Sequence, residues 1–256
     1  MFKHAYHGGP AVEVFTTAGK DPLKNFKVDG SAKNVQKIFD KQMKGSIYNL
    51  DGATTKIQIP ANEKDTLGLL QPFLVFQIYI PSSAKNLLKI ELAITDAEKT
   101  KRRLIFHSGS TNSKDSKGQG GIVTNPFHAR IPISSFKRDQ WLNLSIDVFA
   151  FAHYCFKGVQ PKTLDLISIT SMCKLRKIFT MRCPTYDDDI DGSAVLQDAL
   201  DKLTMDEFGG NSSQILFEFV PKNLDFVANS CTYANQFIFP QRIIKHEEAA
   251  AAQSAS

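Results

Sequence analysis

The 256-residue sequence predicts a mainly β fold: an antiparallel β-sandwich with two or three short helices and a C-terminal extension. Three observations indicate this class. About ten short segments alternate apolar and polar residues, turn-forming residues separate these segments, and long stretches with helical periodicity are few. A sheet with one apolar face has to bury that face against another layer, so we expect two packed sheets.

The expected strands follow one another along the first part of the chain. They are residues 12–16, 46–50, 55–59, 73–80, 88–95, 102–107, 129–133, 142–148, 164–170 and 175–181. Residues 142–148 alternate without interruption, which predicts a strand with one apolar and one polar face. Residues 73–80 are almost continuously apolar, which is typical of a central strand covered on both faces.

Three helices are expected from apolar residues at helical spacing. The first begins after Ser31 as its N-cap and ends at Lys44. Its apolar stripe would contain Val35, Ile38, Phe39 and Met43, and its opposite, solvated stripe Lys33, Lys37, Lys41 and Lys44. The second runs from residue 147 or 148 to Lys157, with Gly158 as a left-handed C-cap. The third covers residues 192–205.

The charge distribution divides the chain at Cys183. Residues 1–183 hold 27 Lys and Arg against 14 Asp and Glu, a net charge of +13, whereas residues 184–256 hold 4 against 12, a net charge of −8. We therefore expect a basic β-sandwich domain followed by an acidic extension. The extension should contain the third helix, a strand at 214–220, an aromatic strap at 224–244 and a low-complexity end. A basic body favours an anionic partner.

The sequence gives little support for catalysis. It has no Walker loop, no dinucleotide-type glycine motif, no nucleophile elbow and no paired-histidine zinc motif. The four cysteines are too far apart in sequence for a zinc knuckle or a thiol-redox motif. Neither a signal-like segment nor an apolar run long enough to span a membrane is present. We predict a soluble, non-enzymatic protein that needs no cofactor and has no membrane partner.

One acidic segment matches part of a calcium-binding loop. Asp187, Asp189, Asp191, Gly192 and Asp198 occupy positions 1, 3, 5, 6 and 12 of such a loop, and a helix is expected to follow. Position 12 carries Asp in place of the longer, bidentate Glu. The alternative is an acidic loop that precedes a helix, where carboxylates interact favourably with the helix dipole. Both interpretations stay open at this point.

Basic clusters are the stronger functional signal. They comprise Lys101, Arg102 and Arg103 at the start of one expected strand, Lys137 and Arg138 before Trp141, and Lys174, Arg176 and Lys177 at the start of another. Alternate residues of a strand project from one face, so these side chains could present a positive ridge to an acidic surface. Alternatively, they are solvated charges that protect strand edges from aggregation.

The aromatic strap is the second candidate contact region. It carries Phe226, Tyr233, Phe237 and Phe239 in an otherwise polar and weakly periodic segment. Such a segment is expected to lie across a surface, either of this protein or of a partner.

Seven stretches of the chain carry a family resemblance. They are residues 1–3, 67–75, 91–96, 101–104, 128–132, 141–144 and 173–180, read as MFK, LGLLQPFLV, ELAITD, KRRL, HARIP, WLNL and CKLRKIFT. In this order they resemble the cilia- and flagella-associated protein twenty family, most closely its larger, domain-containing member. The resemblance covers residues 1–183. The insertion at 109–121 and the acidic segment after Cys183 depart from the short family pattern.

The resemblance implies a jelly-roll β-sandwich with a structural role in the axoneme of cilia and flagella. It also implies a place at the inner junction, where the A- and B-tubules of a doublet microtubule meet. Tubulin surfaces are acidic and would complement the basic body. We therefore expect tubulin and other axonemal proteins as partners, bound through the basic clusters and the strap.

Two other classes are kept as alternatives. The same basic sandwich could bind nucleic acid, although base stacking needs exposed aromatic rings among the charges. A glycan-binding module is also compatible with the fold class, but Trp141 is the only tryptophan and has no partner ring for a binding platform.

Overall fold

The computed structural model describes residues 9–62, 64–84, 88–108, 121–133, 136–170, 172–189, 220–227 and 231–245. Within these ranges the chain forms two seven-stranded sheets, which we name sheet A and sheet B. Most strand pairs are antiparallel, and the exceptions are β8 with β10 and β11 with β14. The predicted β-sandwich class is therefore confirmed.

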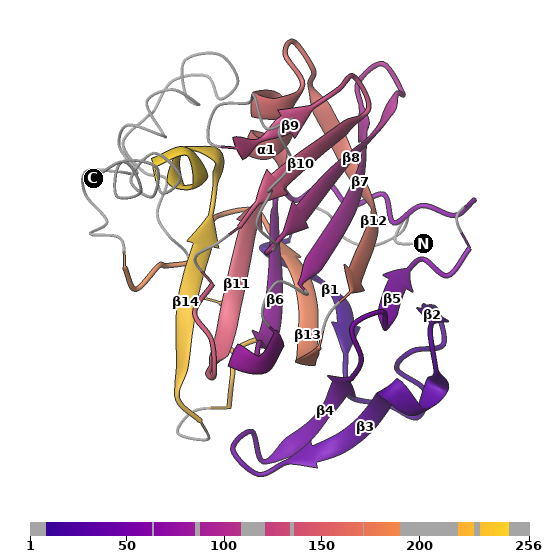
Figure 1. Cartoon of the computed structure of the whole chain (residues 1–256), viewed down its shortest axis with the longest axis vertical. Coiled ribbons are helices and arrows are strands. Elements are labelled where there is room, and N and C mark those ends of the chain that lie inside the picture. Colours follow the sequence, from indigo (N-terminus) through magenta and orange to yellow (C-terminus); the bar gives the residue numbers. More distant parts are fainter. Residues whose placement is uncertain are drawn as a thin grey trace.

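Sheet A contains seven strands. Their spatial order is β14 (Tyr233–Ile238), β11 (Trp141–Asp147), β6 (Phe73–Tyr79), β13 (Cys173–Met181), β4 (Gly45–Leu50) and β3 (Val35–Asp40), with β1 (Ala11–Thr16) also paired to β13. Figure 1 shows β14 at one border of this sheet and the β3–β4 hairpin extending away from the other.

Sheet B contains the other seven strands. Their spatial order is β2 (Lys27–Asp29), β5 (Lys56–Ile59), β12 (Pro161–Thr170), β7 (Lys89–Asp96), β8 (Lys101–His107), β10 (His128–Pro132) and β9 (Val123–Thr124). Two short 3-10 turns, η1 (Ala32–Asn34) and η2 (Ser82–Ala84), and the helix α1 (Val148–Cys155) complete the named elements.

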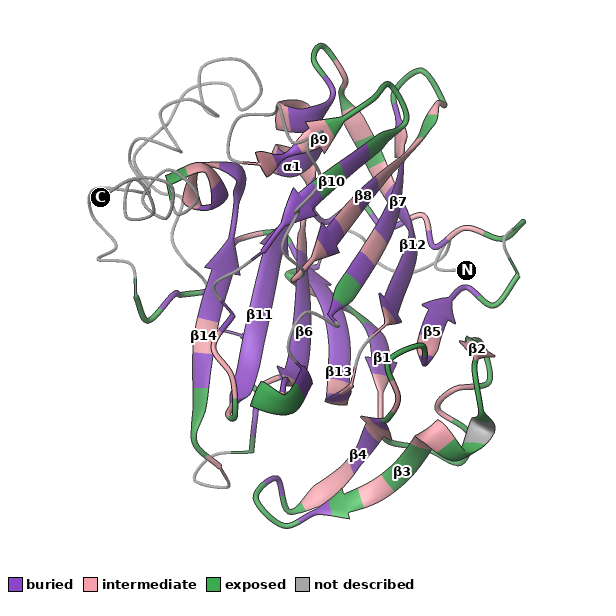
Figure 2. Ribbon diagram, viewed as in Figure 1, coloured by how far each residue is buried: buried purple, intermediate pink, exposed green. Residues whose placement is uncertain are grey.

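The main core fills the space between the two sheets. Alternate residues of the central strands point into it, among them Leu74 and Phe76 of β6, Leu144 of β11, Leu92 of β7 and Phe106 of β8. All five are at most 1% exposed. Figure 2 shows the buried residues concentrated on these central strands. Each fully buried side chain of this size contributes about 1.5–3 kcal/mol, so the core is the dominant source of stability.

All ten strands expected from the period-two pattern are present, with ends shifted by at most three residues. Strand β6 lies between β11 and β13 and is buried on both faces, as predicted. Strand β11 differs from the expectation, because its polar face is buried as well. Asn143, Ser145 and Asp147 lie beneath other parts of the chain and not in solvent.

The helix predicted between Ser31 and Lys44 is wrong. This segment forms η1 and then β3, which pairs with β4 through a tight turn, so that Ile38 faces Ile47 and Phe39 faces Ser46. Helical periodicity would have placed Phe39 in the core, but its side chain is 67% exposed. Cross-strand pairing outweighs the weak helical preference of this polar segment.

The second predicted helix is confirmed as α1. Asp147 is its N-cap, and one carboxylate oxygen accepts the backbone N–H of Ala150 at 2.8 Å. The helix ends at Cys155, two residues before the predicted end, and Gly158 takes a left-handed φ of 75° in the following turn. The third predicted helix and the strand predicted at 214–220, apart from Val220, lie outside the described residues.

Residues beyond Cys183 take part in the same sandwich. Strand β14 pairs in parallel with β11 from Trp141 opposite Tyr233 to Ile146 opposite Ile238, and residues 240–245 are helical. The boundary predicted at Cys183 thus separates two regions of opposite charge, yet the second region supplies a strand to the first. Among the described residues, no helix is long and apolar enough to cross a membrane.

Candidate partner-binding surfaces

The cations of β13 lie on the outer face of sheet A. A bulge between Leu175 and Lys177 interrupts the alternation of the strand. Arg176 and Lys177 therefore both contact the segment of residues 220–227, which crosses this face and which we name the cover segment. The predicted ridge is therefore largely covered in this chain.

Arg176 is the central contact of the cover segment. Its guanidinium donates to the backbone oxygen of Asp225 at 2.9 Å and to the side-chain oxygen of Gln77, and it lies 5.4 Å from the centre of the Phe226 ring. Burial lowers the pKa of Arg176, while the charge of Asp225 acts in the opposite direction. Gln77 in turn donates to the backbone oxygen of Leu224 at 2.7 Å, so sheet and segment share one hydrogen-bond network.

Lys177 and Lys174 also have partners within the chain. Lys177 is 8% exposed, donates to the backbone oxygen of Asn223 at 2.6 Å and lies 3.5 Å from a carboxylate oxygen of Glu13. Burial and the neighbouring Arg176 lower the pKa of Lys177, and Glu13 opposes this shift. Lys174 pairs with Asp40 at 3.1 Å. A partner would have to replace these contacts to reach either ammonium group.

The loop cations Lys137 and Arg138 are held in a similar way. Lys137 lies 2.9 Å from a carboxylate oxygen of Asp189, and Arg138 donates to the backbone oxygens of Pro81 and Ala84 at 3.4 Å each. Both side chains are half-buried. Their positions favour a structural role in fixing the loop before β11.

The strap aromatics are mostly part of the protein interior. Phe226, Phe237 and Phe239 are 4–5% exposed, and Phe226 packs edge-to-face on Trp141 with ring centres 5.9 Å apart. Tyr233, at 36% exposure, is the one strap ring of the four that reaches solvent. The strap therefore crosses this protein's own sheet, and three of its four rings are inaccessible to a partner in this fold.

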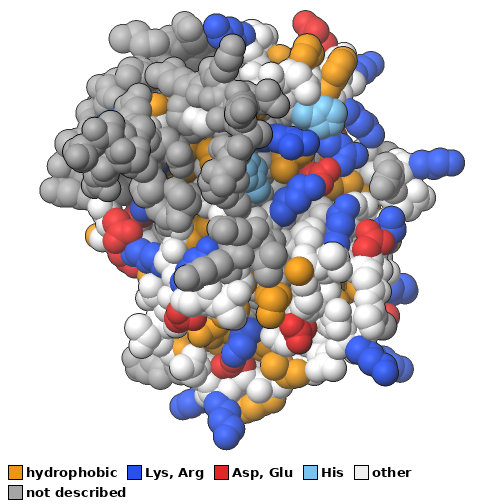
Figure 3. All heavy atoms as spheres, in the orientation of Figure 1, with side chains coloured by type: hydrophobic (Ala, Val, Ile, Leu, Met, Phe, Trp, Pro, Cys, Tyr) orange, Lys and Arg blue, Asp and Glu red, His pale blue; other side chains and the backbone are white. Residues whose placement is uncertain are grey.

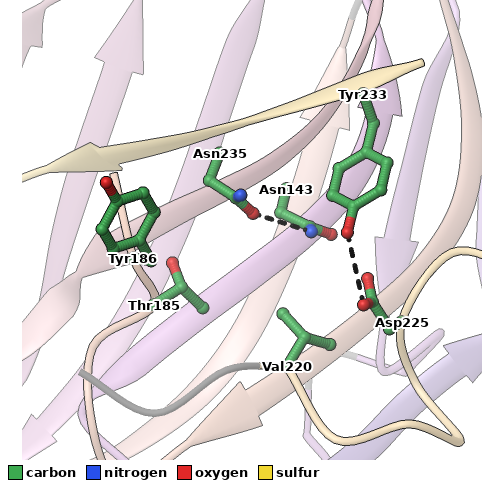
Figure 4. A pocket seen from close by; sticks show the side chains of 7 residues that line it. All are labelled: Asn143, Thr185, Tyr186, Val220, Asp225, Tyr233 and Asn235. Carbon is green, nitrogen blue, oxygen red and sulfur yellow. Dashed lines mark hydrogen bonds between the residues drawn. The ribbon is translucent and has the colours of Figure 1, made fainter. Parts of the chain in front are cut away.

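A small cavity lies between the cover segment and β14. Asn143, Tyr233 and Asn235 are among its lining residues (Figure 4), and its volume is about 30 Å³. Asn143 donates to Asn235 at 3.0 Å across it. Small-molecule sites usually enclose about 300–1,000 Å³. This cavity has room for water only, and it offers no substrate site.

The proposed calcium residues within the described part of the chain have other partners. Asp187 is buried, forms an ion pair with Arg242 and accepts the backbone N–H of Phe237. Asp189 pairs with Lys137 and lies 3.5 Å from Arg242. Asp191 and Asp198 lie outside the described residues. Calcium binding thus remains a prediction. Asp187, the first ligand position of the proposed loop, already contacts Arg242 and the backbone N–H of Phe237 in β14.

Two buried cysteines are poor nucleophiles. Burial raises the pKa of the Cys155 and Cys173 thiols to about 12 each. A thiol with such a pKa is almost fully protonated at neutral pH, and the thiolate is the reactive form. These two residues act as small apolar core residues.

The outer face of sheet B presents a cluster of accessible positive charge. By strand alternation, Lys101 and Arg103 of β8 point away from the core together with Lys89 of β7. The parallel register of β8 and β10 places His128 beside Arg103 and Arg130 beside Ile105. We name Lys89, Lys101, Arg103, His128 and Arg130 the sheet B basic face. Figure 3 shows Lys and Arg side chains gathered over β7, β8 and β10.

One carboxylate interrupts this face. Glu91 forms ion pairs with Arg103 and, at 3.3 Å, with Lys89. Burial alone would raise the pKa of Glu91, but the two cations outweigh burial and lower it. Within the described part of the chain, the exposed side chains of Lys101 and Arg130 have neither an ion pair nor a hydrogen-bond partner. The face therefore keeps an uncompensated positive charge.

Arg102 does not belong to this face. It points to the opposite side of β8, where it pairs with Asp96 at 3.0 Å and lies 5.3 Å from the centre of the Phe156 ring. Of the eight cations predicted to bind a partner, only Lys101 and Arg103 lie on the open sheet B basic face. Lys89, His128 and Arg130 were missed, because they lie outside the three basic clusters of the sequence.

A comparison with known families assigns the chain. The model of the CFA20 domain matches residues 1–196. The chain belongs to the CFA20 domain family. It is 26% identical over 186 residues to "Cilia- and flagella-associated protein 20" of Chlamydomonas reinhardtii and 24% identical over 183 residues to the protein of that name from Paramecium tetraurelia. Each match covers 70% of this chain and 87% of the relative. The predicted family is confirmed.

The limit of the CFA20 domain match has a structural meaning. The match contains the sheet B basic face and the cations of β13, but it ends before the cover segment and β14. Residues outside the matched domain therefore cover the outer face of sheet A in this chain. Among the described residues, the sheet B basic face is a part of the CFA20 domain that these C-terminal residues do not cover.

Proposed function

We propose that this chain is a non-enzymatic structural protein of the ciliary or flagellar axoneme that binds doublet microtubules, at or near the inner junction of the A- and B-tubules. Membership of the CFA20 domain family and the names of its relatives support a place in cilia and flagella. The sheet B basic face is the observation that supports an acidic lattice such as tubulin as the partner. Other axonemal proteins would contact neighbouring surfaces.

The mechanism is adhesion. A positive face steers the chain to an acidic surface and sets its orientation, while apolar contacts prolong the bound state. The exposed cations Lys101 and Arg130 are the best placed to act, because neither has to give up an ion pair within the described residues. Arg103 has to share its charge with Glu91 and should contribute less.

Co-sedimentation with polymerised microtubules tests this proposal. The double variant Lys101→Glu/Arg130→Glu should weaken binding about tenfold or more, and added salt should weaken the wild type in the same direction. Lys20→Glu/Lys24→Glu is the matched control, since it changes the net charge equally at two exposed lysines before β2, at the opposite end of sheet B from β8 and β10. Equal loss of binding in both double variants would show that only net charge matters and would contradict the proposed face.

The nucleic-acid alternative has one observation in its favour. Phe127 is 54% exposed next to His128, so a base could stack beside the basic face. A filter-binding titration with single-stranded and duplex nucleic acid separates the two functions. Tighter binding to nucleic acid than to microtubules would favour this alternative.

A further inference from the structure

The β3–β4 hairpin is a rigid projection at the border of sheet A (Figure 1). Asp40 organises its turn: one carboxylate oxygen accepts the backbone N–H groups of Gln42 at 2.9 Å and Met43 at 3.0 Å, and the other pairs with Lys174 at 3.1 Å. Burial would raise the pKa of Asp40, but these contacts together lower it. The charged form of Asp40 thus holds the turn in one conformation.

One face of the hairpin is packed. Met43 and Ile47 are at most 2% exposed and form a small cluster with Trp141 and Phe226 on the outer side of sheet A. Ile38 packs against the same cluster. The hairpin is therefore anchored to the sandwich through its apolar residues, and its orientation is set before any partner binds.

The other face leaves an aromatic ring in solvent. Phe39 points away from Ile38 and is 67% exposed, which makes it the most exposed large apolar side chain among the described residues. The lysines nearest to it in sequence, Lys37, Lys41 and Lys44, are exposed as well. The acidic residue of this stretch, Asp40, is already occupied by Lys174 and the turn.

Edge protection accounts for only part of this arrangement. β3 is the last strand of sheet A, and lysines on an edge strand discourage pairing with other chains. An exposed phenylalanine has the opposite effect, because it adds an apolar contact at the edge. Aromatic side chains, Phe included, are enriched in protein interfaces, and an exposed ring held in a fixed position is suited to such a contact.

We propose that the β3–β4 hairpin is a docking arm for an acidic protein surface, in which the Phe39 ring fills an apolar recess and the lysines around it face carboxylates. Charge complementarity identifies the partner chemistry. The arm is pre-organised, so little conformational entropy is lost on binding. This inference rests on the proposed function. The arm adds a second contact with the microtubule, at the border of sheet A opposite to β14.

Microtubule co-sedimentation of three variants tests the arm. Phe39→Ala should weaken binding by about tenfold, in the range of an interface anchor. Lys37→Glu/Lys41→Glu should weaken binding more strongly than Lys157→Glu/Lys162→Glu, which changes the same net charge at exposed lysines outside the arm. All variants change exposed side chains, and the emission of Trp141 confirms that each is folded.

The outcomes separate this inference from the proposed function. A wild-type chain that does not bind microtubules would overturn both. Binding that responds to Lys101→Glu/Arg130→Glu, but not to Phe39→Ala or Lys37→Glu/Lys41→Glu, would overturn the docking arm alone. Vesicles that contain phosphatidylserine, an anionic lipid of the cytoplasmic leaflet, provide the last comparison. Phe39-dependent binding to these vesicles without Phe39-dependent binding to microtubules would make the arm a membrane contact and would also overturn the inference.

Discussion

The guanidinium of Arg176 lies 5.4 Å from the centre of the Phe226 ring and fastens the cover segment to the outer face of sheet A. Arg176 is in the matched CFA20 domain, and Phe226 lies beyond it. The sequence placed Arg176 in a candidate partner-binding cluster and left open whether the strap with Phe226 lies on this protein or on a partner. In the fold, Arg176 and Phe226 contact each other. The C-terminal extension therefore accepts hydrogen bonds from cations of the domain and covers apolar residues that the domain alone would leave exposed.

Replacing Arg176 by alanine should loosen the cover segment. The change removes hydrogen bonds to Asp225 and Gln77 and leaves the Gln77 oxygen buried without its donor. We expect a loss of about 2–3 kcal/mol in the free energy of unfolding. Backbone hydrogen exchange should become faster in residues 220–227 than it is in the wild type, and it should change less in β7 and β8.

Arg130→Ala is the control for this substitution. Its side chain is exposed, and surface substitutions of this kind usually change stability by less than about 0.5 kcal/mol. Equal destabilisation by the two substitutions, or unchanged exchange in the cover segment, would show that Arg176 does not hold the segment.

Phe226→Ala should expose Trp141. The indole is 1% exposed and packs between Phe226 and Tyr79, with ring centres 5.9 and 6.0 Å away. Trp141 is the only tryptophan of the chain, so its fluorescence reports this site alone. We expect a red-shifted emission, stronger quenching by acrylamide and a loss of about 3–5 kcal/mol in stability. Phe39→Ala, at an exposed ring, should leave the emission unchanged, and a shift in this control would contradict the assignment.

The strands were predictable because alternation survives wherever one face of a strand meets the core. The β3 segment was not, since its apolar residues Val35, Ile38, Phe39 and Met43 fit helical spacing better than alternation. In the fold their surroundings differ: Met43 is buried in a cluster with Trp141, whereas Phe39 faces solvent. The spacing of apolar residues within one segment does not show which other strand that segment will pair with.

The candidate site shows the same limit. Counting cations identified Lys101 and Arg103, but it could not show that Arg176 and Lys177 would be covered by residues 220–227. Nor could it place Arg130, which reaches the basic face only through the parallel pairing of β8 and β10. Charge is a property of the sequence, whereas access to that charge depends on contacts between distant segments.

Asp147 should make stability depend on pH. Burial raises the pKa of this N-cap carboxyl to about 7 from its ordinary value of 3.8. Between these values the folded state binds more protons than the unfolded state, so the contribution of this group to the free energy of unfolding falls as pH rises from about 4 to about 7. Above pH 7 the contribution stays low.

Asp147→Asn should remove this dependence. The Asn oxygen can still accept the N–H of Ala150 without ionising. Urea unfolding from pH 4 to pH 8 should therefore show similar stability for both proteins near pH 4 and an advantage of roughly 2–4 kcal/mol for the variant at pH 8. A difference that does not change with pH would show that Asp147 is not protonated in the folded chain.

Asp187 should act as a clamp on β14. One of its carboxylate oxygens accepts the N–H of Phe237 and pairs with Arg242, at the border of sheet A where β14 has β11 as its only strand neighbour among the described residues. Asp187→Ala leaves the Phe237 N–H without its acceptor and leaves the half-buried Arg242 with only the backbone oxygen of Phe237 and Asp189 as partners, which should cost about 3 kcal/mol and speed hydrogen exchange in β14. Asp189→Ala is the control, because Asp189 is half exposed and its replacement should cost less than about 1 kcal/mol of stability.

The same contact argues against a calcium site. Because Arg242 already neutralises Asp187, millimolar Ca²⁺ should leave the urea midpoint of the wild type unchanged. Stabilisation by Ca²⁺ that disappears in Asp187→Ala would instead establish the calcium site and would show that Arg242 gives way to the metal.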